Sequence, residues 1–280
     1  MSEFYVIATP IGNLQDITLR ALETIRLSDV IICEDTRITA RLLEKYEIKN
    51  KKLLVYNDNS DEVTRKKILH LLLSGLNVAL VSDAGTPLIS DPGYKLVCFL
   101  REHNIKVTPL PGASSVTTAL SASGIACDHF LFYGFLPSSQ IQRQNTLKDL
   151  PKNFTLVFFE SSVRILETLE DLYKIFNNRK IAVARELTKI HEEIVNDELG
   201  KVIEFFRQNP EKIRGEFVII LEKANRSEKA LTQEELEVEI RKAVGDGMSI
   251  KELSEHLSQI HGLHKKEIYQ LALKLQNRTA

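Results

Sequence analysis

The sequence predicts an α/β fold of two α/β domains followed by a small helical appendage. Through most of the chain, short runs rich in β-branched residues alternate with longer segments of helical spacing, which is typical of parallel sheets with crossover helices. The pattern changes character near Phe130 and becomes purely helical near Thr232. We therefore expect domains at residues 1–124, 125–225 and 226–280.

The first domain is expected to alternate strands with helices. Its strands are short apolar runs bounded by turn residues, at Phe4–Thr9, Asp29–Glu34, Lys52–Tyr56, Asn77–Ser82 and Ile105–Leu110. Its helices are expected at Thr18–Leu27, Arg37–Tyr46, Asp61–Ser74, Tyr94–His103 and Ser114–Ser123. Thr18 and Ser60 are suited to cap helix starts, and Gly75 and Gly124 to close helix ends.

The second domain is expected to contain a mixed sheet. Its strands are expected at Phe130–Phe135, Phe154–Glu160, Lys180–Arg185 and Glu216–Glu222, and its helices at Arg143–Leu150, Val163–Phe176 and Leu199–Gln208. In the appendage, Thr232 begins a capping box, and Ser249 and His264 open two further helical segments. These two segments suit either a helix-turn-helix or an amphipathic cap on the rest of the protein.

The composition excludes several classes of protein. Its 280 residues are 43% hydrophobic and 27% charged, which is too apolar for a disordered chain. The net charge of −1 provides no global positive field for nucleic acid, so RNA binding would need local clusters. Three cysteines without a C-x-x-C pair indicate reduced thiols in the cytoplasm. The sequence contains neither a signal-peptide pattern nor an apolar run long enough to span a membrane, and its histidines form no metal-binding pattern.

Three turns that leave strands of the first domain contain proline, glycine and small hydroxyl residues. They are Thr9–Leu14, Ser82–Gly93 and Pro111–Ser115. Ligands of open parallel sheets bind beyond the carboxyl ends of the strands, and such turns allow close approach of a ligand to backbone amides. One such turn would be an ordinary connection, but three at one edge favour a binding cleft. Neither G-x-G-x-x-G after a strand nor a P-loop is present, so phosphate is not the obvious ligand.

Two charged clusters could take part in chemistry. Glu34 to Arg37 lies where a strand meets a helix, and at least one of its acids is expected to cap that helix. Arg185 to Glu193 places six ionisable groups in nine positions after a strand of the second domain. This second cluster suits either acid–base chemistry or a solvated loop.

Several segments together resemble the tetrapyrrole-methylase superfamily of S-adenosylmethionine-dependent methyltransferases. Within it, they are most similar to the branch that methylates bacterial small-subunit ribosomal RNA. The matching segments are Val6–Leu14, Asp16–Thr18, Glu34–Arg37, Val81–Pro87, Ile89–Gly93, Pro111–Ser115, Ala119–Gly124 and Ala184–Lys189. The similarity covers Phe4 to Glu222, and so many motifs in order make a chance match implausible.

The resemblance implies a homodimer with S-adenosylmethionine in a cleft between the two α/β domains. The implied cofactor-binding residues are Pro10, Ile11, Gly12, Asp83, Gly85, Thr86, Ile89, Pro111, Gly112, Ala113 and Ser114. The implied reaction is methyl transfer to the 2′-hydroxyl of a cytidine in the decoding region of 16S rRNA in the small ribosomal subunit. No metal is required for it.

Such a transfer requires that the hydroxyl lose a proton. Asp35, Glu186 or Lys189 could accept it, and Arg37 and Arg185 could steady phosphate or carboxylate groups.

The chain departs from this branch at potential RNA-facing positions. Glu160–Arg164 lacks the usual proline and histidine, Asn57 stands in a segment without its usual histidine, Ser138–Ser139 lacks a common basic residue, and the usual Arg-Gly does not follow His191–Glu193. Two alternatives therefore stay open: a tetrapyrrole C-methyltransferase and a catalytically inactive ribosome assembly factor. The former usually carries Gly-Asp-Pro where this chain has Gly85-Thr86-Pro87.

Overall fold

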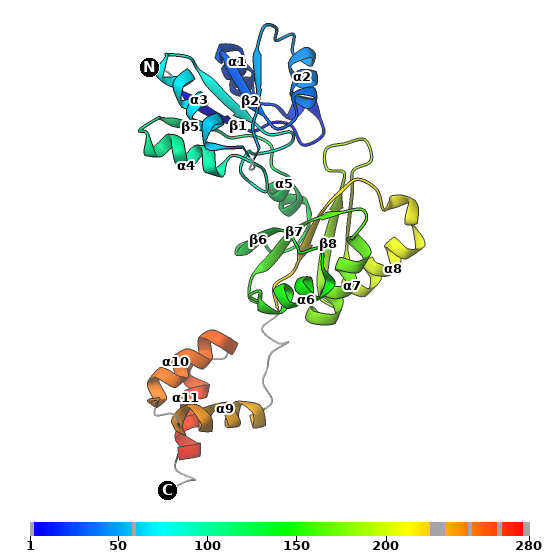
Figure 1. Cartoon of the computed structure of the whole chain (residues 1–280). Coiled ribbons are helices and arrows are strands. Elements are labelled where there is room, and N and C mark those ends of the chain that lie inside the picture. Colours follow the sequence, from blue (N-terminus) through cyan, green and yellow to red (C-terminus); the bar gives the residue numbers. More distant parts are fainter. Residues whose placement is uncertain (1–2, 58–59, 225–232, 246–247, 262–264, 277–280) are drawn as a thin grey trace. The chain divides into compact units, whose positions relative to one another are not determined.

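The computed structural model describes residues 3–57, 60–224, 233–245, 248–261 and 265–276. They form two compact units, which are Met1–Leu150 with Thr155–Glu222, and Pro151–Phe154 with Lys223–Ala280. The first unit contains two sheets with their helices, and the second contains helices in its described residues between 233 and 276 (Figure 1). This confirms the predicted α/β fold with a helical appendage. The boundaries at residues 124 and 225 stay a prediction.

The first sheet is parallel throughout and has the strand order β3-β2-β4-β1-β5. Its strands are β1 (Phe4–Ile7), β2 (Val30–Cys33), β3 (Lys52–Val55), β4 (Val78–Val81) and β5 (Val107–Leu110). Because all the strands run the same way, the turns that follow them gather at one edge. This edge carries the residues predicted to bind a ligand.

Helices cover both faces of the first sheet. Alternate strand residues such as Ile31 and Ala79 pack with α1 (Leu19–Leu27) and α2 (Thr36–Lys45). Their neighbours, such as Ile32 and Val78, pack with α3 (Glu62–Leu73) and α4 (Tyr94–Glu102). Burial on both faces explains why the central strands are continuous apolar runs.

The predicted helix ends are mostly confirmed. The Thr18 hydroxyl accepts a bond from the Ala21 amide at 3.0 Å, and Gly75 and Gly124 have φ of 92° and 65°. The prediction for Ser60 is wrong, because Asp61 caps α3 by accepting from the Thr64 amide at 2.8 Å. A carboxylate is the stronger acceptor for a free first-turn amide because it carries a full negative charge.

The second sheet is mixed, as predicted, with the order β6-β7-β10-β8-β9. Its strands are β6 (Phe130–Phe135), β7 (Thr155–Ser161), β8 (Lys180–Arg185), β9 (Glu193–Glu198) and β10 (Glu216–Leu221). Helix α5 (Ser115–Ala122) packs its buried face against this sheet. The other helices of this region are α6 (Gln140–Asp149), α7 (Ile165–Phe176) and α8 (Leu199–Gln208). Short 3₁₀ turns occur at Leu14–Asp16 and Pro210–Lys212.

The second unit contains α9 (Gln233–Gly245), α10 (Ile250–His261) and α11 (Lys265–Gln276), which share an apolar core. Ser249 opens α10 as predicted, since its hydroxyl accepts from the Glu252 amide while Glu252 accepts from the Ser249 amide. The predicted starts at Thr232 and His264 lie outside the described residues. Among the helices that the structure describes, none has the length and apolar character to cross a membrane.

Candidate functional site

A cavity of about 440 Å³ lies between the carboxyl edge of the first sheet and the second sheet. We call it the rim pocket. Its lining residues come from both sheets: Ile11, Glu34, Asp83–Thr86, Ile89–Asp91, Ser114–Val116, Phe135, Phe159–Ser161, Leu187 and Gly215–Val218. A cavity of this volume suits a nucleoside-sized ligand.

The three predicted turns converge at this pocket. The turns after β1 and β4 are joined by paired backbone bonds, from the Thr9 amide to the Gly85 carbonyl at 2.8 Å and back at 3.0 Å. The Thr86 hydroxyl donates to the Ala113 carbonyl at 3.2 Å and so ties the turn after β4 to the turn after β5. The side chains of the three turns therefore meet around one cavity.

The predicted cofactor residues fall into two groups. Ile11, Asp83, Gly85, Thr86, Ile89 and Ser114 line the rim pocket. Pro10, Gly12, Pro111, Gly112 and Ala113 lie in the same turns but do not line it. Gly112 packs closely against the residue that follows β1, because a Cβ at Gly112 would come within 2.8 Å of the Ala8 Cβ.

Gly12 holds the first turn against the second sheet. A Cβ at Gly12 would lie 2.6 Å from the Lys189 Cγ and 2.9 Å from the Leu187 carbonyl oxygen, a backbone atom that cannot swing away. Next to it, the Asn13 amide donates to the Thr188 hydroxyl at 3.0 Å. Only a residue without a side chain allows this approach.

We expect Gly12→Ala to destabilise the protein by about 1–3 kcal/mol, because the added methyl pushes the first turn away from residues 187–189. Urea-induced unfolding measures the change. Gly245→Ala is the matched control, since a Cβ at the end of α9 would meet no atom within 4 Å. Equal stability of Gly12→Ala and wild type would contradict the close packing.

The rim pocket is acidic. Glu34, Asp83, Asp91, Glu160 and Glu216 line it, and none of its lining residues, all of them in the described part of the chain, is a lysine or arginine. Burial raises the pKa of Asp83. Burial also raises the pKa of Asp91 to about 6, and the negative charges of Glu34 and Asp83 add to this shift. The pocket therefore favours a cationic ligand over an anionic one.

Asp35 and Arg37, predicted to be catalytic, pair with each other outside the pocket lining. The Asp35 carboxylate accepts from the Arg37 amide at 2.8 Å and from its guanidinium at 2.6 Å, so it caps α2. These hydrogen bonds lower the pKa of Asp35 to about 2. Such a carboxylate is a weak base. The backbone amide of Asp35 donates to the Asp83 carboxylate at 3.2 Å and so helps to hold this pocket carboxylate in place.

The other three predicted catalytic residues come together at the second sheet. The Lys189 ammonium lies 2.8 Å from Glu186 and 3.1 Å from Glu216, and Arg185 lies 3.4 Å from Glu193. Burial opposes the charge of Glu186, but the bonds from Lys189 and the Glu216 amide outweigh it and lower the Glu186 pKa. Burial likewise opposes the charge of Lys189, yet its two carboxylate partners raise its pKa. None of these three residues lines the rim pocket, but Glu216, the partner of Lys189, does.

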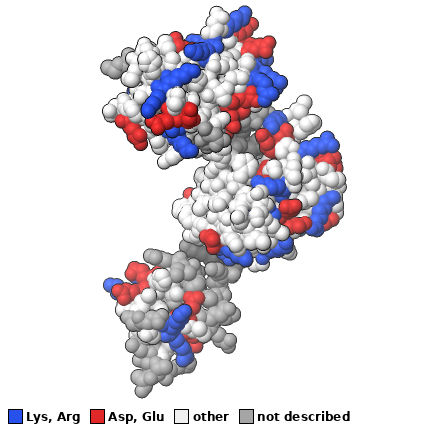
Figure 2. All heavy atoms as spheres, viewed as in Figure 1, with Lys and Arg blue, Asp and Glu red and all other residues white. Residues whose placement is uncertain are grey.

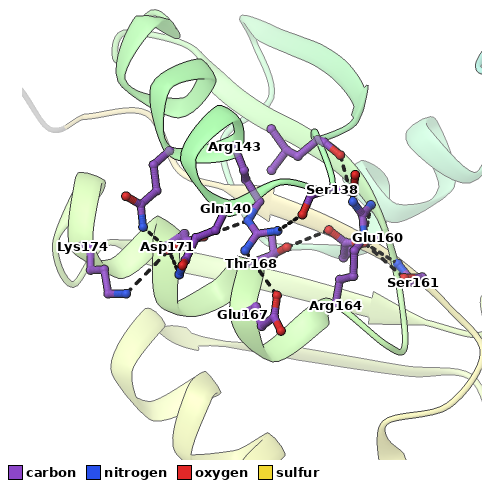
Figure 3. Close-up of polar contacts among 12 residues, drawn as sticks. Ser138, Gln140, Arg143, Glu160, Ser161, Arg164, Glu167, Thr168, Asp171 and Lys174 are labelled. Carbon is purple, nitrogen blue, oxygen red and sulfur yellow. Dashed lines mark hydrogen bonds and ion pairs between the residues drawn. The ribbon is translucent and has the colours of Figure 1, made fainter.

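The wall formed by Glu160 and Ser161 was not among the predicted site residues. Figure 3 shows how Glu160 is held: its carboxylate accepts from the Ser161 amide at 2.8 Å, from the Arg164 guanidinium at 2.9 Å and from the Thr168 hydroxyl at 2.7 Å. A fully bonded buried carboxylate is a rigid part of a wall. The segment differs from the usual motif at Ser162 and Val163, which draws attention to it in the sequence. The sequence does not indicate, however, that this segment faces the rim pocket.

Known proteins share both the sequence and the fold. Residues 3–203 match the family described as Tetrapyrrole (Corrin/Porphyrin) Methylases. Proteins named ribosomal RNA small subunit methyltransferase I are similar along most of the chain. That of Rickettsia prowazekii is 47% identical over 79% of this chain and 78% of its own length. That of Haemophilus influenzae is 41% identical over 96% of this chain and 95% of its own length.

A shorter relative with the same name comes from Thermotoga maritima. It is 45% identical over 222 residues, which are 79% of this chain but 98% of the relative. A protein of this name therefore exists without a counterpart to about a fifth of the present chain.

Solved structures support the fold. Cobalt precorrin-4 methyltransferase has a TM-score of 0.60 at 20% identity and covers 79% of this chain and 94% of its own. A uroporphyrin-III C-methyltransferase of Thermus thermophilus, complexed with S-adenyl homocysteine, has a TM-score of 0.53 at 19% identity over 79% and 97%. The chain thus belongs to the tetrapyrrole (corrin/porphyrin) methylase family and, within it, to the group of ribosomal RNA small subunit methyltransferases I.

Proposed function

We propose that the rim pocket binds S-adenosylmethionine and that the chain transfers its methyl group to the 2′-hydroxyl of a cytidine in the decoding region of 16S rRNA. The observation that carries this proposal is the pocket itself, which is formed by the three predicted turns and lined by carboxylates without a basic side chain. S-Adenosylmethionine supplies a methyl group on a sulfonium cation, and this cation suits an acidic pocket.

The pocket residues fit such a donor. Ile11, Val116, Leu187, Val218 and Phe217 provide apolar surface for a purine, and the turns at Asp83–Thr86 and Ser114–Ser115 provide polar groups beside it. Pro10, Gly12, Pro111, Gly112 and Ala113 would support these turns from behind. The complex of the Thermus uroporphyrin methyltransferase with S-adenyl homocysteine also supports a donor site in this fold.

The names of the relatives support an RNA acceptor. A pocket that excludes water and aligns the attacking oxygen with the methyl carbon supplies much of the acceleration in such a transfer. Arg37, with its side chain 84% exposed, is available to an RNA phosphate beside the site. We assign to Asp35, Arg185, Glu186 and Lys189 the task of fixing the turns on either side of the pocket, through the ion pairs described above.

We also propose a homodimer formed through β6, an edge strand of the second sheet. Phe130, Tyr133 and Phe135 of this strand are exposed. Figure 2 shows few charged side chains on this part of the molecule, whereas charges of both signs cover the region of the first sheet. Exposed aromatic side chains on an uncharged face are typical of a subunit interface. Light scattering should give a dimer mass, and Tyr133→Glu should give a monomer.

Methyl transfer is tested with the donor labelled in its methyl group. We expect label in the ribose of 16S rRNA when the protein meets unmethylated small ribosomal subunits. Label in a porphyrin precursor but not in rRNA would indicate a tetrapyrrole C-methyltransferase. Binding of neither donor nor S-adenosylhomocysteine would indicate an assembly factor without catalytic activity.

A further inference from the structure

A second cavity shares a wall with the rim pocket. It is lined by Glu34, Asn57, Leu88, Ser90, Asp91, Pro92 and Tyr94, and it is the more open of the two. Glu34, Ser90 and Asp91 line both cavities. A molecule in one cavity therefore lies next to a molecule in the other, with Asp91 between them.

The loop that forms this shared wall is strained. Leu88 and Ser90 have φ of 73° and 61°, a conformation that non-glycine residues adopt at a cost. The strain places Ser90 and Asp91 at the boundary of the two cavities. Strained backbone clusters at functional sites, and here it lies next to the Asp91 carboxylate.

Asp91 is set apart from the other acids of the region by its lack of hydrogen-bond donors. In the described parts of the chain, no side chain or backbone amide donates to its carboxylate, and the charged groups that act on it are Glu34 after β2 and Asp83 after β4. Glu160, by contrast, has all its oxygens occupied. Within the described residues, these carboxylates do not form part of a group arranged to hold a metal ion. Asp91 is thus a partly buried carboxylate that is available to a bound molecule.

Tyr94 provides an aromatic surface in the lining of the second cavity. It is the first residue of α4, and it is 69% exposed. The Cys98 thiol, one turn along the helix, raises the pKa of the Tyr94 hydroxyl. An exposed aromatic ring is a stacking platform for an unpaired base.

We propose that the second cavity is the acceptor subsite, which takes one flipped-out nucleotide with its base on Tyr94 and its ribose hydroxyl at Asp91. This inference rests on the proposed function, because it places the acceptor beside a methyl donor in the rim pocket. The rim pocket can hold the donor by itself, so the adjoining and more open cavity is free to take the nucleotide.

The proposed step conserves atoms and charge. The ribose oxygen forms a bond to the methyl carbon, the carbon–sulfur bond breaks, and its electron pair remains on sulfur. The hydroxyl proton passes to the Asp91 carboxylate, which becomes a neutral carboxylic acid and later releases the proton to water. Burial, aided by the negative charges of Glu34 and Asp83, raises the affinity of Asp91 for that proton.

The stacking role is tested with Tyr94→Leu and Tyr94→Phe. We expect Tyr94→Leu to weaken binding of unmethylated small ribosomal subunits about tenfold, and Tyr94→Phe to retain binding within about twofold, because the stacking ring survives. Filter binding in the presence of S-adenosylhomocysteine measures this affinity, and calorimetry with S-adenosylhomocysteine should give the same donor affinity for all variants. Tyr173→Leu, also an exposed tyrosine on a helix, is the matched control.

The proton-accepting role is tested with Asp91→Asn, which should lower kcat about 100-fold or more and leave the affinity for the subunit within about threefold. The acceptor subsite alone would be overturned if the wild-type protein binds the donor and methylates subunits while Tyr94→Leu keeps its subunit affinity and Asp91→Asn keeps its kcat. Failure of the wild-type protein to bind the donor would instead overturn the proposed function.

Discussion

Methyl transfer by this protein is expected to slow about tenfold for each pH unit below about 6, the pKa of Asp91, and to reach a plateau above about pH 7. Asp91 must be ionised to accept the hydroxyl proton. Burial, aided by the charges of Glu34 and Asp83, raises its pKa, so the carboxylate is protonated and inactive at a pH where an ordinary aspartate would still be ionised. Single-turnover rates with saturating donor and subunits, from pH 5 to 8, measure this profile.

Asp91→Asn should abolish the pH dependence of methyl transfer as well as lower its rate. The variant is expected to show a flat profile, at a level about 10²–10⁴-fold below the wild-type plateau. Because the folded wild type binds the Asp91 proton more tightly than the unfolded chain does, ionisation of Asp91 destabilises the fold above pH 4, and the amide avoids this cost. Asp91→Asn should therefore melt at a higher temperature than wild type at pH 7.5, and the difference should vanish near pH 4.

The exposed Asp149 at the end of α6 provides the control for this substitution. Asp149→Asn should leave the pH profile and the melting temperature unchanged. A wild-type rate that is constant from pH 5 to 8 under single-turnover conditions would contradict the role of Asp91.

Arg143→Met is expected to destabilise the protein by about 3–5 kcal/mol, because it removes the buried cation from the buried Asp171 carboxylate and leaves only the exposed Lys174 ammonium at 3.6 Å. Arg143 and Asp171 both have fully buried side chains and meet at 2.8 Å between α6 and α7 (Figure 3). Burial opposes the charge of Asp171, but bonds from Gln144 and Arg143 outweigh it and lower its pKa. Urea-induced unfolding at pH 7 measures the loss.

The double variant Arg143→Met/Asp171→Leu should recover most of that stability, since two apolar side chains of similar size can replace a buried ion pair. The stability that Asp171 contributes should also fall as the pH is lowered below about 4, because its folded-state pKa lies below its unfolded value. A single Arg143→Met variant as stable as wild type would show that the pair contributes nothing. A double variant as unstable as the single one would show that Arg143 stabilises the protein by its packing rather than by its charge.

Most of the fold could be predicted from the sequence because the central strands are buried on both faces. β8 and β6 have the predicted bounds, and the strands of the first sheet end within two residues of theirs. β9 was missed because Glu193–Glu198 contains three acids and lies at the edge of its sheet, where only one neighbour pairs with it. Polar edge strands lack the apolar run that identifies a strand.

The site could be predicted only on the side of the first sheet. Turns that combine proline and glycine after parallel strands identify Ile11, Asp83 and Thr86 as pocket residues, because topology alone brings such turns together. The opposite wall, at Glu216–Val218, belongs to β10. The apolar run of β10 resembles that of other buried strands, so it gives no sign of a site. Asp91 lies inside a predicted turn, but its burial and its lack of donors depend on packing that the sequence does not reveal.

Hydrogen exchange with and without S-adenosylhomocysteine tests most directly whether the three turns at the rim of the first sheet form the donor site. We expect saturating S-adenosylhomocysteine to slow exchange of the amides of residues 11–13, 83–90 and 112–115, with little change in β3 at the far edge of the same sheet. Saturable binding that leaves these amides unprotected would place the donor elsewhere and contradict the account.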